Sequence, residues 1–229
     1  MGAASEIEGA GVGPVPLTPI VAWLRDTGAP VTRFSQSTLV STPAGLGADH
    51  VRDALAALID RHDALRLTLE TDDEGRWEQR VREPGTVDAS ECLHRVDVSG
   101  PDDDELRTVL LREGEAVRSR LDPERGAVLR AAFFDRGPGQ DGMLLMVVHH
   151  LAVDAVSWRV LLPDLAEACE SLLAGEPVRL QPVGTSLRSW ATRLTELAHE
   201  PALAADAPAG RRPCGNPHGP GRPAARQGE

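Results

Sequence analysis

Apolar residues recur along this chain at two spacings, one typical of strands and the other of helices. The unbroken apolar run over residues 143–148 has the length of a strand that is buried on both faces. A second pattern places apolar residues three and four positions apart, on one face of a helix: Val51, Leu55, Leu58 and Ile59. The chain is therefore expected to have an α/β fold, a mixed sheet packed with helices.

Caps and turn formers divide the rest of the chain into further short elements. A helix is expected from the acidic residues 102–104 to about 119. Three more helices are expected to start at residues that favour a cap: Thr18, Ser157, and either Thr185 or Ser186. Strands are expected at six stretches rich in β-forming residues: 31–40, 65–70, 77–81, 94–98, 128–134 and 143–149, the last two forming a hairpin.

The two ends of the chain differ in composition from the middle. Residues 1–15 are small, Gly-rich and acidic, which predicts a flexible leader, with order beginning near Thr18. The segment 201–229 is mostly Ala, Pro, Gly and Arg, and such a segment buries too little apolar surface to offset the entropy of ordering it. We therefore expect one globular lobe over residues 16–200, followed by a disordered tail.

Charge and cysteine content restrict the class of protein. The net charge of −11 argues against a nucleic-acid partner, because nucleic-acid binders need a clustered positive face. No apolar stretch approaches the roughly 20 residues that span a bilayer, and residues 1–13 lack the pattern of a signal peptide. The three cysteines are far apart, which fits neither a disulfide framework nor a zinc site. The sequence thus predicts a cytoplasmic protein that binds no membrane, with reduced cysteines.

The candidate chemistry lies at the end of the apolar run, where His149 and His150 are followed by Asp154. An imidazole can move a proton near neutral pH, and a carboxylate can orient it or hold the loop. The same three residues are also compatible with two structural histidines at the end of a strand. A metal site is less favoured, because successive strand residues point to opposite faces and no third ligand has a suggestive spacing.

The sequence around the histidines, HHLAVDAVSWRVLLPDL over residues 149–165, resembles the HHxxxDG motif of nonribosomal peptide synthetase condensation-type domains. Its VSWR-LL-DL continuation looks like the epimerization subtype. Three more segments match family motifs in order and spacing: PLTPIVAWL at 16–24, RHDALRLTL at 61–69 and TSLRSWATRL at 185–194. The chain departs from the family at Val21 and Leu24, where Gln and Phe are usual, and at Ala155, which replaces the motif glycine. A methyl group there would cost on the order of 1 kcal/mol if the backbone needed a positive φ.

The resemblance implies a lobe of the chloramphenicol-acetyltransferase type, half of a domain whose active site lies in a tunnel between two lobes. His150 would face the tunnel as the acid/base or enolate-stabilising group, and His149 would be structural. Asp154 would hold the loop through an ion pair with an arginine, for which Arg66 or Arg61 are the candidates. No bound cofactor is implied, since a peptidyl carrier protein domain would bring the substrate on its phosphopantetheine arm.

Several functions stay open at this point. The chain is expected to be a truncated epimerization-type lobe that needs a missing second lobe and is inactive alone, because the opposite catalytic group is absent. The alternatives are a non-catalytic remnant or carrier-docking module, a peptide-bond-forming condensation domain, and a glycerolipid acyltransferase, whose H-x4-D spacing His149 and Asp154 also satisfy. Trp158 and Trp190 are interpreted as core residues.

Overall fold

The computed structural model describes residues 11–28, 31, 34–100 and 103–201. The predicted tail, apart from Pro201, and most of the predicted leader lie outside the described residues. The helices are α1 (Pro19–Thr27), α2 (Ala48–Arg61), α3 (Ala89–Cys92), α4 (Asp103–Arg118), α5 (Trp158–Leu173) and α6 (Leu187–Ala198), with a short 3-10 helix at Asp63–Arg66. The strands are β1 (Gly13–Val15), β2 (Ser35–Thr42), β3 (Leu67–Thr71), β4 (Trp77–Val81), β5 (Leu93–Asp97), β6 (Leu129–Asp135) and β7 (Gly142–His149).

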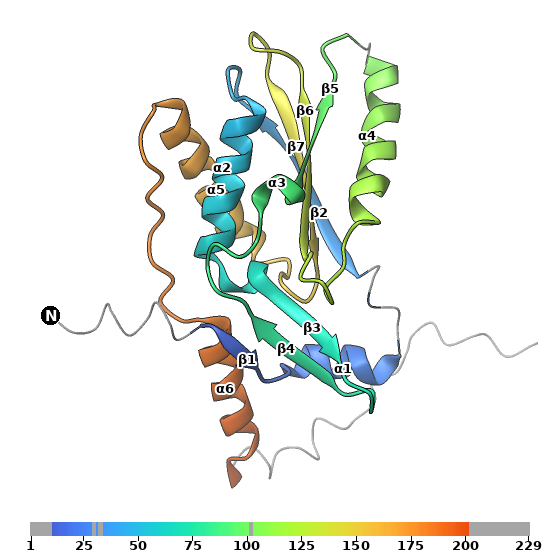
Figure 1. The fold of residues 1–229 in the computed structure, drawn as a ribbon, viewed down its shortest axis with the longest axis vertical. Helices are drawn as coiled ribbons and strands as arrows, with labels where there is room; N and C mark the ends of the chain where they lie inside the picture. Colours follow the sequence, from blue (N-terminus) through green and yellow to red (C-terminus); the bar gives the residue numbers. More distant parts are fainter. Residues whose placement is uncertain (1–10, 29–30, 32–33, 101–102, 202–229) are drawn as a thin grey trace, which may run out of the picture.

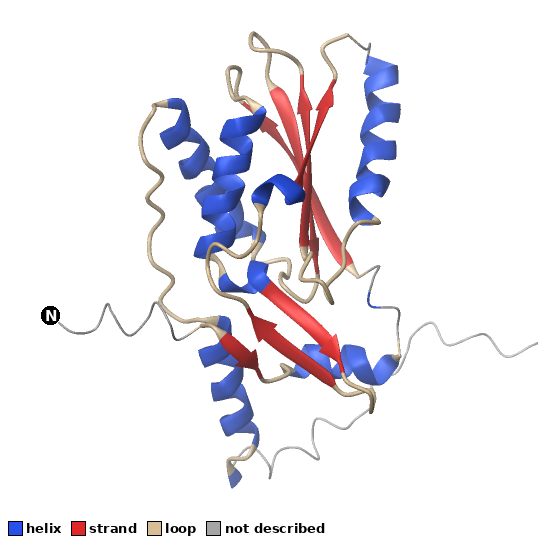
Figure 2. Cartoon of the chain, viewed as in Figure 1, coloured by secondary structure: helices blue, strands red, loops and turns tan. Residues whose placement is uncertain are grey.

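A four-stranded mixed sheet forms the centre of the molecule, with the strand order β2-β7-β6-β5 (Figure 2). Strands β6 and β7 form the predicted antiparallel hairpin, and β5 adds to β6 in the parallel direction. The apolar run lies on β7, between β2 and β6, so the sheet covers both of its edges and its residues are mostly buried. The prediction of a strand buried on both faces is confirmed.

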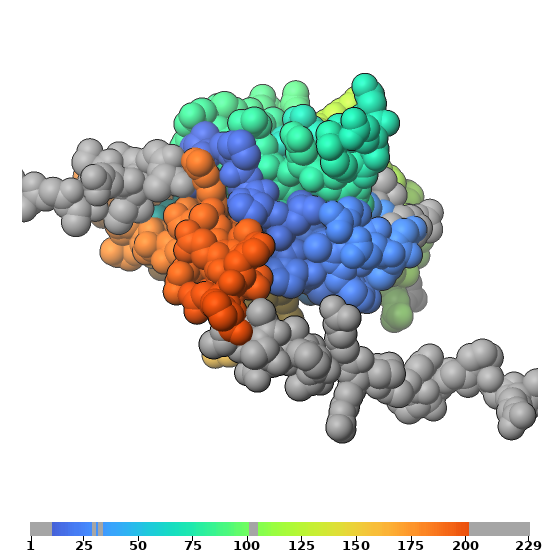
Figure 3. Space-filling view, turned by 90° about the horizontal axis from the view of Figure 1, so that it is seen from below, coloured from blue at the N-terminus to red at the C-terminus, as the bar shows by residue number. Residues whose placement is uncertain are grey.

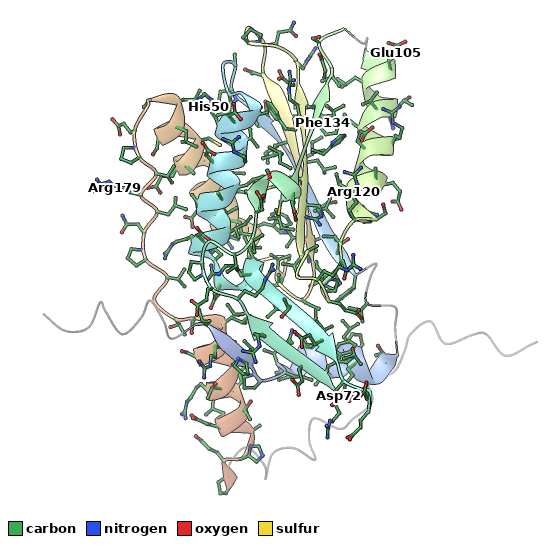
Figure 4. All side chains as sticks on the ribbon, in the orientation of Figure 1. His50, Asp72, Glu105, Arg120, Phe134 and Arg179 are labelled. Carbon is green, nitrogen blue, oxygen red and sulfur yellow. The ribbon has the colours of Figure 1, made fainter. Side chains whose placement is uncertain are left out.

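Helices cover both faces of this sheet, as Figure 1 shows. Helices α2 and α5 pack together on one face, where the stripe residues of α2 are buried in the largest apolar cluster: Val51, Leu55, Leu58 and Ile59. Helix α4 covers the other face through a smaller cluster that includes Phe134, labelled in Figure 4. Burial of apolar surface on two sides accounts for the α/β layering that the sequence predicted.

A three-stranded sheet, β1-β4-β3, lies below the main one in Figure 1. Helices α1 and α6 lie at the same end of the molecule as this small sheet, as Figures 1 and 3 show, and α6 packs beside β1. Helix α1 starts with Pro19 after the N-cap Thr18, as predicted, although the Thr18 side chain makes no capping hydrogen bond. Gly28 ends the helix in the left-handed conformation, at φ 63°, which glycine adopts without steric cost.

Two expectations about this end of the molecule are wrong. Gly13–Val15 is a strand paired with β4 rather than part of a flexible leader, and Val15 is buried against β3 and β4. Trp190, which we expected in the core, has 54% of its surface exposed on α6. The neighbouring Ala191 is the buried residue of that helix, so α6 contacts the small sheet with a different face.

Candidate functional site

The histidine pair lies where β7 leaves the sheet, and the pairing with β2 positions it. His149 is the last residue of β7 and lies opposite Ser35 of β2. The ladder continues for one more bond, because the backbone N–H of His150 donates to the Phe34 carbonyl at 2.8 Å. Side chains alternate between the faces of a sheet, so the two imidazoles have different surroundings.

His149 is completely buried, with an exposed fraction of 0%. Its Nε2 lies 2.7 Å from the Val31 carbonyl oxygen, and its Nδ1 accepts the backbone N–H of Leu151 at 3.1 Å. Burial lowers the pKa of His149, and the bond to the Val31 carbonyl opposes that shift in part. Both ring nitrogens are therefore engaged within the protein, which favours the structural role that the resemblance implied for this residue.

His150 is only half-buried, and its ring is stacked on Phe34 with a centroid distance of 4.4 Å and an interplanar angle of 11°. Its Nε2 lies 3.1 Å from Nε2 of Gln36, the second residue of β2. The Gln36 carbonyl Oε1 in turn accepts the indole N–H of Trp158 at 2.8 Å. The ring of His150 is thus held by one stacking contact and one hydrogen-bond chain that begins on α5.

Asp154 is exposed, and its carboxylate closes the turn that precedes α5, whose N-cap residue is Ser157. Its Oδ1 accepts the backbone N–H groups of Val156 at 3.0 Å and Ser157 at 2.8 Å, and the Ser157 hydroxyl at 2.7 Å. The hydrogen bond from the Ser157 hydroxyl is the main cause that lowers the pKa of Asp154. The carboxylate holds the loop, but it does so through hydrogen bonds within its own turn.

The expected ion pair between Asp154 and Arg66 is wrong: among the described residues Asp154 is in no salt bridge. Arg66 is 4% exposed, and its guanidinium donates hydrogen bonds to backbone carbonyls instead, those of Ile59, Asp60 and Arg82. Burial lowers the pKa of Arg61, the alternative partner, and the carboxylate that opposes this shift is that of Asp164 rather than Asp154. The physical reason is that the hydrogen bonds of the 154–157 turn satisfy the Asp154 carboxylate locally.

A second histidine and carboxylate pair links the RHDALRLTL segment to the segment that follows the two histidines. His62, which follows α2, has its Nε2 2.7 Å from Oδ2 of Asp164 in α5. Burial is the largest influence on the pKa of His62 and lowers it, whereas the bond to Asp164 acts in the opposite direction. The pair joins the RHDALR segment to the helix after the histidines at the level of their side chains.

Ala155 causes no backbone strain, since every described residue with a positive φ is a glycine. The condition under which the alanine would have been costly is therefore not met in this loop. Across the described ranges, no group of three or more His, Cys, Asp or Glu side chains is placed to hold a metal ion. None of the described helices combines the length and apolar character needed to cross a membrane.

A hollow near the small sheet does not have His150 among its lining residues. It measures about 980 Å³ and lies between the end of α4 and the small sheet, with Trp77, Arg118 and Arg120 in its walls. Val31, whose carbonyl bonds His149, also lines it. The hollow is therefore lined by the residue whose carbonyl bonds His149.

Sequence reasoning missed Phe34, which directly precedes β2, and Gln36 of β2, the two residues that contact the ring of His150. They are two positions apart, as residues on one face of a strand must be, and a glutamine inside a β-forming stretch was the available signal. The distance of 114 residues between Gln36 and His150 made the contact invisible without the strand pairing.

Comparisons with known proteins agree on one family. The model of the Condensation domain family matches residues 24–207. Linear gramicidin synthase subunits C and B of Brevibacillus parabrevis are 36% and 34% identical over 87% and 85% of this chain, which spans only 2% and 4% of their lengths. Chondramide synthase cmdD of Chondromyces crocatus is 33% identical over 82% of this chain, which covers 5% of that protein.

Solved structures give the same answer for the fold. The epimerization domain from the third module of tyrocidine synthetase B superimposes with a TM-score of 0.78 at 27% identity, covering 88% of this chain and 44% of that chain. The first condensation domain of the CDA synthetase gives a TM-score of 0.67 at 20% identity, over 86% of this chain and 48% of that one. This chain thus spans about half the length of either solved domain, and it belongs to the condensation-domain family of nonribosomal peptide synthetases.

Proposed function

We propose that this chain is the histidine-bearing, N-terminal lobe of an epimerization-type domain. When complete, the domain would invert the Cα centre of an aminoacyl or peptidyl thioester on the phosphopantetheine arm of a peptidyl carrier protein domain. The observation that carries the proposal is His150, half-buried at the end of β7 in a fold that superimposes on an epimerization domain. That superposition has a higher TM-score and identity than the one with the CDA condensation domain.

The chemistry requires three contributions. A thioester makes the α-proton more acidic, a base removes that proton, and a hydrogen-bond donor stabilises the enolate oxygen while the proton returns to the opposite face. His150 would supply one acid/base or donor group, held in place by Phe34 and Gln36. The other groups would come from a second lobe, so we expect the isolated chain to be inactive.

His149 and Asp154 would act indirectly in this proposal. His149 would anchor the end of β7 through its bonds to Val31 and Leu151, and Asp154 would fix the start of α5. Arg66 would support the fold by joining α2 to the end of β4 rather than by holding the active-site loop.

The experiment supplies the second lobe from a known relative. Residues 1–200 replace the matching half of the tyrocidine synthetase epimerization domain, and the hybrid is incubated with an aminoacyl-loaded carrier in deuterium oxide. We expect incorporation of deuterium at Cα by the hybrid and none by the isolated chain. The His150→Ala hybrid should lose at least about 100-fold in rate, the usual lower range for an acid/base group. Circular dichroism and thermal melting of both hybrids control for folding.

The other outcomes identify the alternatives. A folded hybrid that joins two aminoacyl groups without inverting either would favour a peptide-bond-forming condensation domain. A folded hybrid that does neither, while the isolated chain binds the carrier, would contradict the proposal and favour a docking module.

A further inference from the structure

The hydrogen bonds of His149 determine which of its nitrogens carries the hydrogen. A backbone N–H can only donate, so the bond from Leu151 at 3.1 Å requires a lone pair on Nδ1 of His149. Its hydrogen is then on Nε2, which lies 2.7 Å from the Val31 carbonyl and donates to it. His149 is therefore held as the Nε2–H tautomer.

The neighbouring His150 has the reverse arrangement, for a reason that begins at Trp158. An indole nitrogen has a hydrogen to donate and no lone pair to accept with, so the 2.8 Å bond to Gln36 must end on the amide oxygen. The amide NH2 of Gln36 is then the group that faces Nε2 of His150 at 3.1 Å. Because that group can only donate, Nε2 of His150 must be the acceptor.

We propose that Gln36, oriented by Trp158, is a positioning residue that fixes His150 as the Nδ1–H tautomer, opposite to that of His149. The lone pair of the His150 ring is thereby placed on Nε2. Phe34 adds to this control, since its stacked ring keeps the imidazole plane from turning. The catalytic meaning of the inference rests on the proposed function: a substrate group that reaches Nε2 would replace the Gln36 amide as its hydrogen-bond partner.

The tautomers can be measured on the intact chain without any substrate. The chain is labelled with 15N-histidine, and long-range 1H–15N correlation spectra are recorded at alkaline pH, where the imidazoles are neutral. The signals of the two residues are assigned by their loss in the His149→Gln and His150→Gln variants. We expect the Nε2–H pattern for His149 and the Nδ1–H pattern for His150, the latter in about five-fold excess or more, the ratio that one ordinary hydrogen bond supports.

Three variants separate a positioning role from a merely structural one. Gln36→Glu offers one oxygen to Trp158 and one to His150, so it should reverse His150 to the Nε2–H tautomer. Trp158→Phe frees the amide to rotate, and Gln36→Leu removes it, so each should leave a mixture of both tautomers. Thr38→Val, two residues along the same face of β2, is the control and should change neither histidine.

Folding is checked by the unchanged tautomer of His149 and by the thermal midpoint of each variant. If Gln36→Glu fails to fold, Trp158→Phe decides the question alone. The proposal is overturned if wild-type His150 shows the Nε2–H pattern, or if the folded variants keep the wild-type tautomer. These spectra do not depend on catalysis, so an inactive hybrid would count against the proposed function and leave this inference standing.

Discussion

Replacing Arg66 by methionine should destabilise the chain strongly, although Arg66 contacts neither histidine. The guanidinium, 4% exposed, donates from Nη1 to the carbonyls of Ile59 at 2.7 Å and Asp60 at 2.6 Å, and from Nε to Arg82 at 3.0 Å. The first two carbonyls belong to the last turn of α2, where the helix dipole favours a cation. Methionine has a similar length but no donor, so the variant would leave these carbonyls without their partner.

The expected magnitude follows from opposing terms. A hydrogen bond from a charged donor contributes about 1.5–3 kcal/mol, so three would give about 4.5–9 kcal/mol. Burial opposes this gain: it is the largest influence on the pKa of Arg66 and lowers it, while Asp63 acts the other way. We therefore expect a net loss of about 3 kcal/mol in the free energy of unfolding, or about 6–12 °C in thermal midpoint for a domain of this size.

Thermal melting and urea titration, both followed by circular dichroism, measure the loss. Arg76→Met is the matched control, because the Arg76 side chain is 69% exposed and pairs with the carboxylates of Asp72 and Glu74 in its own turn. It should change the free energy of unfolding by less than about 1 kcal/mol. Arg66→Lys should fall between the two, because an ammonium cannot reproduce the planar fork. Equal melting of the Arg66→Met and Arg76→Met variants would refute the reasoning.

A double-mutant cycle tests the absence of an ion pair between Arg66 and Asp154. The effects of Arg66→Met and Asp154→Ala should add within about 0.5 kcal/mol, as for independent sites. A coupling energy above about 1 kcal/mol would show that the two charges interact after all.

Three further results are expected. Asp154→Ala should cost about 1 kcal/mol at neutral pH, the usual net contribution of a hydrogen bond, because it removes the acceptor of the turn before α5. The effect of this variant on the urea midpoint should shrink as acid protonates the carboxylate, whose folded-state pKa is lowered. Cys92 and Cys169 should stay unmodified by iodoacetamide at pH 8 in peptide mapping of the native chain and react in urea, because burial raises both pKa values, that of Cys169 to about 11. The free energy of unfolding should fall as the pH drops below about 6.5, because burial lowers the pKa of His62 and His149 and these side chains are therefore protonated more readily in the unfolded chain. The His62→Gln variant should show a weaker dependence of unfolding free energy on pH.

The elements with strong periodicity could be predicted from the sequence, and those that depend on distant partners could not. Strand β4 (Trp77–Val81) has the predicted bounds, and the stripe of α2 is buried as expected. Strand β1 was missed because three residues carry almost no pattern, and only its pairing with β4 makes it a strand. Trp190 was misplaced because an aromatic residue at helical spacing does not show which face of α6 contacts the sheet.

The site divides in the same way. The buried apolar run ending in two histidines indicated where the chemistry lies, and alternation along β7 predicted that their surroundings differ. The partner of Asp154 could not be predicted, because a carboxylate three residues before a serine can either pair with an arginine or cap a helix. In the structure it closes the turn before α5 instead, with bonds to Ser157 at 2.7 and 2.8 Å.

The register between β2 and β7 decides which residues surround His150, and a glycine at the far end of the hairpin constrains that register. A slip of one residue would turn Phe34 and Gln36 to the other face, away from the His150 ring. The apolar run of β7 cannot prevent such a slip, because its residues are apolar on both faces. At Gly142, however, an added Cβ would lie 2.8 Å from the Thr42 hydroxyl and 2.9 Å from the Phe134 carbonyl oxygen, so only glycine fits this register without displacing its neighbours. The close approach of β2, β6 and β7 at Gly142 thus helps to place Gln36 beside His150 at the opposite end of the same strands.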